Sequence, residues 1–117
     1  MHSKNPAVRL RETLDNIAAI ASFTAGFDRE GFGADRKTVY AVVRALDIIS
    51  EASRRLPDEV KERHPEIDWA AIAAAGNIYR HEYEGIDESL IWKTVQDDLE
   101  TLRSAGEAEL KRPPEAV

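Results

Sequence analysis

The sequence predicts an all-α protein, a bundle of four to five up-and-down helices. Apolar residues recur at three- and four-residue spacing through most of the chain, and no stretch alternates as a strand does. The five prolines fall between these periodic segments, where they act as helix boundaries. A chain of 117 residues is the size of one domain. We therefore expect residues 1–117 to form a single helical domain, with residues 1–5 and about 106–117 flexible.

The first helix is expected to run from about Pro6, which is acceptable in a first turn, to about Ala25. Its predicted buried face consists of Val8, Leu10, Leu14, Ile17, Ala18, Ala21 and Thr24. Residues 26–33 are rich in glycine and charge, so they are predicted to form the connection to the next helix.

The second helix is expected to begin behind an N-cap at Asp35 and to end near Leu56, before Pro57. Its predicted apolar face is Val39, Val42, Val43, Leu46, Ile49 and Ala52. The rest of its surface is basic in character, through Arg36, Lys37, Arg44, Arg54 and Arg55. Residues 58–63 are expected to add at most one short helical turn.

The third helix is expected to start at Trp69, behind Asp68 as its cap, and to reach about Tyr83, where Gly85 stops it. Asp87 then caps a fourth helix. That helix is predicted to turn Leu90, Ile91, Val95, Leu99 and Leu102 inward.

The composition excludes several classes of protein. A hydrophobic content of 43% with 32% charged residues is typical of a folded globular chain. The absence of cysteine excludes disulfides, a thiol nucleophile and a zinc–thiolate site. No apolar stretch is long enough to span a bilayer, and the first residues do not resemble a signal peptide, so we expect a cytoplasmic protein without membrane contact. The net charge of −6 argues against a broad basic surface, so nucleic acid would need a local basic patch or a partner's charge.

The third predicted helix carries the most informative residues. At 100° per residue, Asn77, Arg80, His81 and Glu84 fall within about 100° of one another as a polar strip. The neighbouring face is formed by Trp69, Ile72, Gly76, Tyr79 and Tyr83. Five alanines between residues 70 and 75, followed by Gly76, allow another helix to approach closely, and a second copy of the chain is one candidate. From the residues alone, the favoured interpretation of the polar strip is a solvated face on which Arg80 and His81 pair with Glu84.

The segment Asn77-Ile78-Tyr79-Arg80-His81-Glu82-Tyr83, followed by Gly85-Ile86-Asp87 and Ile91-Trp92, resembles the signature of HepT-like HEPN domains, the toxins of HEPN–nucleotidyltransferase pairs. Ile48-Ile49-Ser50-Glu51-Ala52 and Pro65-Glu66-Ile67-Asp68-Trp69 are similar to other stretches of that family. The resemblance extends to about Leu102. The usual motif is an arginine, four residues, a histidine, one residue and a tyrosine. Here Gly76 occupies the arginine position, and a cation stands at Arg80 instead.

This resemblance implies an HEPN-like bundle that acts as a metal-independent ribonuclease toxin, with no cofactor and no metal site. It implies a homodimer in which two motifs face each other, an RNA substrate, and a nucleotidyltransferase-fold antitoxin that transfers AMP onto the motif tyrosine. Carried over to this chain, His81 is the catalytic imidazole, Asn77 a supporting polar group and Tyr83 the modified residue, with Arg80 as the catalytic cation. Glu84 and Glu51 are candidate supporting residues, and Glu51 is expected to be a buried polar partner of the motif.

Two alternatives remain open at this point. One is a non-catalytic helical subunit that binds nucleotide or substrate for a separate nucleotidyltransferase. The other is a purely structural dimeric bundle. Gly76 and the acidic balance of the chain favour the first alternative, whereas Asn77, His81 and Tyr83 favour the ribonuclease.

Overall fold

A computed structural model describes residues 5–81 and 87–113, with the side chains of residues 77–81 left out of the description. These residues form helices and no strand, so the predicted all-α class is confirmed. The helices are α1 (Ala7–Thr24), α2 (Arg29–Ala34), α3 (Arg36–Arg54), α4 (Asp58–Glu62), α5 (Trp69–His81), α6 (Glu88–Asp97) and α7 (Leu99–Lys111).

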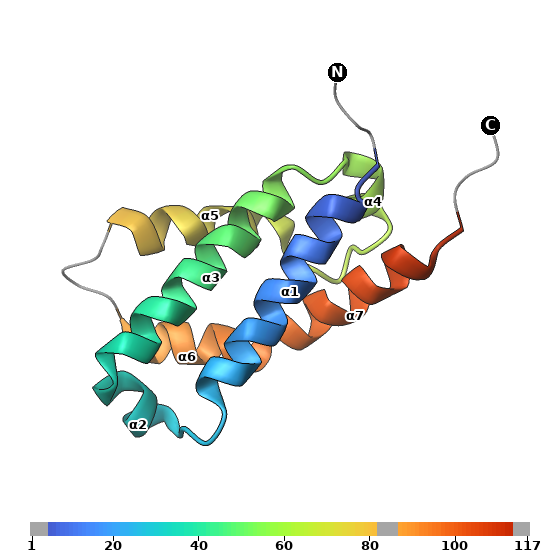
Figure 1. The fold of residues 1–117 in the computed structure, drawn as a ribbon. Coiled ribbons are helices and arrows are strands. Elements are labelled where there is room, and N and C mark those ends of the chain that lie inside the picture. The colour runs from blue at the N-terminus through green and yellow to red at the C-terminus, as the bar shows by residue number, and fades with distance from the viewer. Residues whose placement is uncertain (1–4, 82–86, 114–117) are drawn as a thin grey trace.

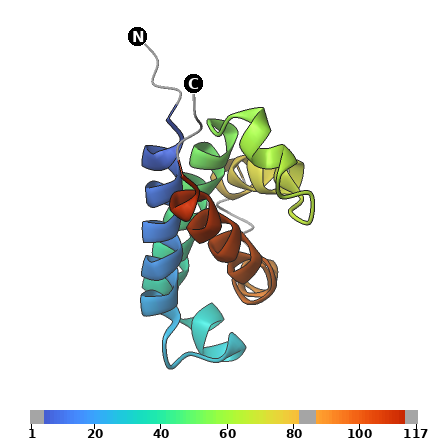
Figure 2. The same ribbon diagram turned by 90° about the vertical axis from the view of Figure 1, so that its right-hand side faces the viewer.

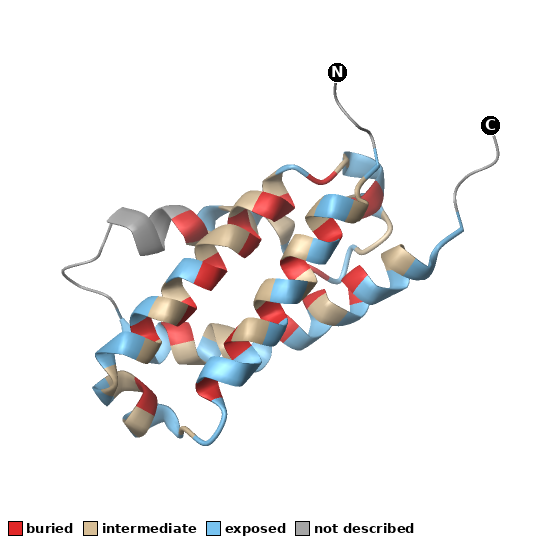
Figure 3. Ribbon diagram, viewed as in Figure 1, coloured by how far each residue is buried: buried red, intermediate tan, exposed pale blue. Residues whose placement is uncertain are grey.

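Helix α3 is the centre of the arrangement. It packs side by side with α1 on one flank and against α5 on the other, while α7 packs on α1 and α6 packs on α2 (Figure 1). Viewed from the side, α6 and α7 form a second layer behind α1 and α3 (Figure 2). Buried positions gather on the helix faces that look toward one another (Figure 3). Helix α3 supplies the largest share of the core, including Val42, Leu46 and Ile49, because its apolar stripe meets both layers.

The buried face of α1 differs from the prediction. Leu10, Ile17 and Thr24 are buried as expected, whereas Val8, Ala18 and Ala21 are exposed. Thr13 and Ile20 take their places in the core. The hydroxyl groups of Thr13 and Thr24 donate to the carbonyls of Arg9 and Ile20, at 2.9 and 2.8 Å. Because these bonds satisfy the hydroxyls, threonine can occupy a face that hydropathy alone assigns to larger apolar residues.

The prediction that residues 26–33 only connect two helices was wrong in part, because residues 29–34 form α2. Asp28 caps this helix by accepting a hydrogen bond from the Gly31 amide at 2.7 Å. Phe32 is fully buried, and its ring lies 5.2 Å from that of Trp92 in α6. Gly26, with φ of +81°, makes the turn between α1 and α2.

The fourth predicted helix is two helices, and they extend further than expected. A break at Asp98 separates α6 from α7, and α7 continues to Lys111. Residues 106–111, which were expected to belong to a flexible tail, lie in α7, and Gly106 is buried there. Leu90, which was expected to point inward, is 46% exposed.

None of the helices in the described part of the chain is both long and apolar enough to cross a bilayer.

Candidate functional site

Helix α5 carries the residues that the sequence singles out. It starts behind Asp68, whose side chain accepts a hydrogen bond from the Ala71 amide at 3.0 Å, and the described helix ends at His81. Asn77, Arg80 and His81 thus lie on its C-terminal part, but their side chains fall outside the description. The predicted residues Tyr83 and Glu84 lie outside the described residues altogether.

The helix is fixed to α3 by a buried serine. Ser50 is fully buried, and its hydroxyl donates to the carbonyl of Ala73 at 2.9 Å while it accepts from the amide of Gly76 at 3.2 Å. Arg54 donates to the same Ala73 carbonyl at 2.6 Å. Three polar contacts therefore hold α5 against α3 in the turn immediately before Asn77.

Gly76 lies where the two helices come closest. A Cβ at this position would lie 2.6 Å from Oγ and 2.9 Å from Cβ of Ser50, and 3.1 Å from Oδ1 of Asp47. No side chain fits there unless Ser50 or one of the two helices is displaced. The close approach predicted from the small residues is thus made, at Gly76, by α3 of the same chain. The geometry also explains why the usual motif arginine is absent at this position.

The surface of α3 next to Gly76 is charged. The Asp47 carboxylate, which is largely buried, accepts a hydrogen bond from Arg44 at 3.1 Å. Two turns further along α3, Arg54 contacts both the Ala73 carbonyl and Glu51, the latter at 2.9 Å. Two arginines and two carboxylates of α3 therefore lie within about two turns of the point where α5 crosses it.

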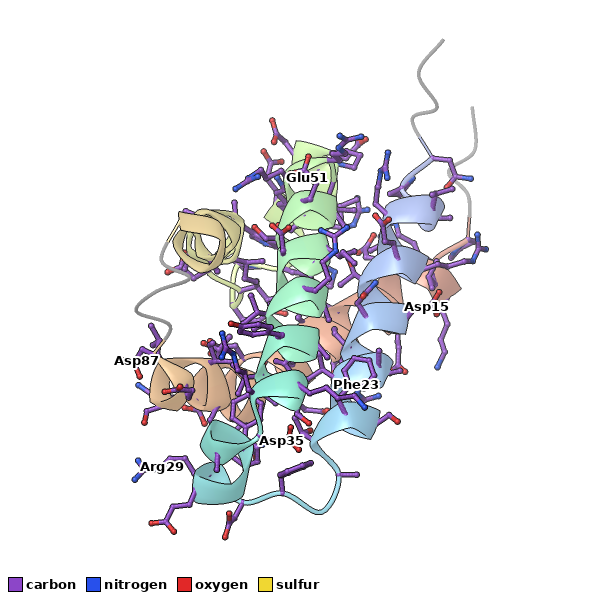
Figure 4. All side chains as sticks on the ribbon, turned by 60° about the vertical axis from the view of Figure 1, so that its left-hand side comes forward. Asp15, Phe23, Arg29, Asp35, Glu51 and Asp87 are labelled. Atoms are coloured by element: carbon purple, nitrogen blue, oxygen red, sulfur yellow. The ribbon has the colours of Figure 1, made fainter. Side chains whose placement is uncertain are left out.

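The predicted burial of Glu51 was wrong. Its side chain is 45% exposed rather than buried, and it pairs with Arg55 and Arg54 at 3.2 and 2.9 Å on its own helix. In Figure 4 it lies on α3, which stands between α5 and α1. Hydrogen bonds from Arg55 and then Arg54 lower the pKa of Glu51, so it is an anion on the outer surface of α3. Its neighbour Ser50 has the buried polar role instead.

Ser50 and Arg54 were missed as residues that position α5. Ser50 is a polar residue between buried Ile49 and buried Ala52, which is a signal for a satisfied interior hydroxyl. The small residues of α5 indicated a close helix contact, but periodicity does not identify the helix on the other side.

A second polar cluster joins α7 to the loop before α5. Arg63 forms two hydrogen bonds with the Glu109 carboxylate, at 2.6 and 3.1 Å, and His64 lies 2.7 Å from the same carboxylate. Arg63 first, and His64 with it, lower the pKa of Glu109, whose side chain is only 6% exposed. His64 lies in a loop, as predicted, but it also helps to fix the C-terminal helix.

A groove of about 410 Å³ lies between the first half of α5 and the α6–α7 layer. Its floor is apolar, with Leu46, Ile49 and Ile72 among its lining residues. Its lining also includes four exposed carboxylic acids, namely Glu66, Asp68, Asp97 and Asp98. Because carboxylates repel phosphate groups, this groove disfavours a phosphate backbone. Within the described residues, no three acidic or histidine side chains gather as a metal site.

Comparison with known proteins gives a consistent set of relatives. The family model described as "Ribonuclease HepT-like" matches residues 13–108. A probable ribonuclease HepT of Thermococcus cleftensis is 40% identical over 94 residues, which cover 80% of this chain and 86% of that protein. A putative RNase of Methanocaldococcus jannaschii is 33% identical over 103 residues, covering 88% of this chain and 94% of the relative.

A putative RNase of Caldanaerobacter subterraneus is 32% identical over 99 residues, covering 85% of this chain and 88% of that protein. No solved structure matches the chain.

Proposed function

Since this chain belongs to the HepT-like ribonuclease family, we propose that it is an RNA-cleaving enzyme, the toxin of a toxin–antitoxin pair. The observation that carries the proposal is the position of His81 on α5, one turn beyond the place where Ser50 and Gly76 fix that helix to α3. A histidine on a helix held in this way has a defined position relative to a substrate.

The proposed reaction needs no metal. The imidazole of His81 removes the proton from a ribose 2′-hydroxyl, and the 2′-oxygen attacks the adjacent phosphorus. The bond from phosphorus to the 5′-oxygen breaks, leaving a 2′,3′-cyclic phosphate, and the departing oxygen takes a proton from a second acid. The guanidinium of Arg80 suits the negative charge that develops on the phosphorane, because its fork matches phosphate oxygens. Asn77 would supply a supporting hydrogen bond.

The need for a second acid supports a homodimer. One copy of the chain offers one histidine near this site, whereas two copies facing each other supply a base and an acid together with two arginines. The groove between the two copies of α5 would then form the active site.

Tyr83 is proposed as the point of control. A nucleotidyltransferase-fold antitoxin would transfer AMP from ATP onto its hydroxyl, with release of pyrophosphate. The added group brings bulk and negative charge beside His81, and both exclude RNA. Glu84 would lie next to this position and support the site.

One observation favours a second candidate function. Position 76 is closed by Ser50, so the arginine of the usual motif cannot stand there. A chain that lacks this cation could serve as a non-catalytic subunit that binds nucleotide or substrate for a separate nucleotidyltransferase.

Cleavage of RNA by the purified chain in the presence of a chelator tests the proposed function. We expect wild type to cleave and His81→Ala to be inactive, because the imidazole is removed. His2→Ala, a histidine substitution elsewhere in the sequence, is the matched control and should cleave as wild type does. Undiminished cleavage by His81→Ala would exclude this residue from the chemistry, and growth arrest on expression of the chain alone separates a toxin from a passive subunit.

The regulatory step has its own test. Incubation with the nucleotidyltransferase encoded beside this chain and ATP should raise the mass of the wild-type protein by one adenylyl group. Tyr83→Phe should keep its mass because it lacks the accepting hydroxyl, and Tyr40→Phe is the control for modification of an exposed tyrosine. Modification of Tyr83→Phe to the same extent would assign the step to another residue.

A further inference from the structure

We propose that the outward face of α3 is the surface that binds the single-stranded RNA substrate. This face is defined by Arg36, Lys37, Tyr40, Arg44, Asp47, Glu51, Arg54 and Arg55, which follow one another around about 100° of the helix surface. The inference rests on the ribonuclease function proposed above and names the part of the chain that holds the substrate.

The first argument is charge. Five of the 16 basic residues of the chain lie between residues 36 and 55, but only two of its 22 acidic residues do. The face is therefore positive in a chain whose net charge is −6. The local basic patch that a nucleic-acid substrate requires thus exists, and it is on this helix.

The two carboxylates of the face do not cancel its charge. Asp47 is bonded to Arg44, and Glu51 to Arg54 and Arg55, each on the same helix at a separation of three or four residues. Arg44 and Arg55 are themselves exposed, and ion pairs of exposed side chains are weak, so these two arginines can turn toward phosphate groups at little cost, whereas Arg54 stays bonded to the Ala73 carbonyl. Arg44, whose side chain is 72% exposed, is the most accessible of these paired arginines.

The second argument is the aromatic residue among the cations. Tyr40 is 48% exposed, and its hydroxyl accepts hydrogen bonds from Nε and Nη2 of Arg36 at 3.0 and 2.7 Å. The Arg36 guanidinium carbon lies 5.1 Å from the ring centroid. A tyrosine ring held in place beside a cation is a platform on which an unpaired base can stack.

The third argument is position relative to the motif. Helix α5 crosses α3 at Asp47 and Ser50, which lie beside Gly76, and the motif begins at the next residue, Asn77. An RNA chain lying along α3 therefore passes the start of the motif. Figure 4 shows α5 nearly end-on beside α3. The acidic groove on the other side of α5 disfavours that path.

Binding of a short fluorescein-labelled single-stranded RNA, followed by anisotropy in the His81→Ala background, tests this inference without loss of the probe to cleavage. The variant Lys37→Gln/Tyr40→Ser/Arg44→Gln removes two charges and the ring from α3. The control Arg11→Gln/Phe23→Ser/Lys93→Gln removes two exposed charges and an exposed ring from α1 and α6. Both variants change the net charge equally, and both must keep the circular dichroism spectrum of the parent.

We expect the α3 variant to lose affinity by roughly tenfold or more, and its slope of log affinity against log salt to fall by about 1.4, since each phosphate contact on a single strand contributes about 0.7. The control should stay within about twofold of the parent, because it touches no part of the proposed path. In the cleaving His81 protein, the α3 variant should raise KM and leave kcat unchanged.

Equal affinity of the two variants would overturn the inference. So would an α3 variant that binds RNA normally but sediments as a smaller species, since that result would assign the face to contact between copies. If the wild-type protein cleaves RNA and the α3 variant has the same KM, the binding surface is rejected and the ribonuclease function is supported. If the wild-type protein binds RNA through α3 but does not cleave it, the binding surface is supported and the proposed ribonuclease function is rejected.

Discussion

Replacement of Gly76 by alanine tests the close approach of α5 to α3. In an unhindered helix this change stabilises by about 1 kcal/mol, because alanine has the higher helix propensity. Here the new Cβ would lie 2.6 Å from Oγ and 2.9 Å from Cβ of Ser50, a residue with no exposed surface. The serine cannot move away without leaving α3 or breaking its bonds to Ala73 and Gly76.

The gain in helix propensity and the steric cost have opposite effects on the free energy of unfolding, and the steric cost is the larger. Overpacking of this kind costs about 1–3 kcal/mol, and the loss of the two hydrogen bonds of Ser50 adds about 1 kcal/mol each. After the gain in helix propensity, we expect Gly76→Ala to lower the free energy of unfolding by about 2–4 kcal/mol. For a chain of this size that corresponds to a fall in Tm of roughly 8–16 °C.

Thermal and urea unfolding, followed by circular dichroism at one protein concentration, measure this effect. Gly33→Ala is the matched control. Its Cβ would lie 3.6 Å from Cβ of Glu88, an ordinary contact, so it should be neutral or stabilising by about 0.5–1 kcal/mol. Ser50→Gly combined with Gly76→Ala should be more stable than the sum of the single changes predicts, because the clashing atoms are gone. A Gly76→Ala protein as stable as the Gly33→Ala protein would refute the reasoning.

Two further predictions concern the packing of the outer helices. Glu109→Gln should lower stability at neutral pH by about 1–2 kcal/mol, because the charged bonds to Arg63 are lost, whereas the exposed Glu107→Gln on the same helix should change little. The pKa of Glu109 is lowered in the folded state. The stability that Glu109 contributes is therefore present above the ordinary glutamate pKa of 4.5 and disappears as the pH falls through the folded-state pKa. A difference in stability between wild type and Glu109→Gln that is independent of pH would contradict this. Phe32→Ala should cost about 3–5 kcal/mol in urea unfolding, and Phe23→Ala, on the surface of α1, no more than about 0.5 kcal/mol. Equal losses in the two phenylalanine variants would show that α2 does not help to hold the core.

The helices that were predicted well owe their form to local signals. Helix α3 begins behind Asp35, which accepts a hydrogen bond from the Thr38 amide at 3.2 Å, and its buried face follows the expected spacing. Both features can be read from neighbouring residues. Helix α2 could not be predicted in the same way, since it is six residues long and contains two glycines. Its formation depends on contact between Phe32 and Trp92, which lie 60 positions apart in the sequence.

The break between α6 and α7 is also a tertiary effect. The apolar spacing from Ile91 to Leu102 continues through Asp98, so the sequence alone indicates one helix. Leu99 and Leu102 nevertheless pack as part of α7, which lies against α1, whereas α6 lies against α2. The chain bends at Asp98 so that α6 can contact α2 and α7 can contact α1. The spacing of apolar residues within a segment does not indicate which helix that segment will contact.

The sequence predicted those features of the candidate site that lie within one helix, but not the contacts between helices. The departure of Gly76 from the usual motif was visible in the sequence, but its cause was not, because Ser50 is 26 residues away. Glu51 was predicted to be a buried partner of the motif because it lies on an apolar-rich helix. On α3 it lies about 100° from Ser50, and this rotation turns it to the outer surface.

The pairing of Gly76 with Ser50 bears directly on where the cation of this site can come from. An arginine at position 76 would require α3 to lie further away, and the contacts from Ser50 and Arg54 to the Ala73 carbonyl would then be lost. The glycine therefore allows α3 to bring its own charged residues close to α5. Restoring the usual arginine by Gly76→Arg is not compatible with this packing. On this reasoning the variant motif is a consequence of how closely the two helices pack, and any cation of the site has to come from a position other than 76.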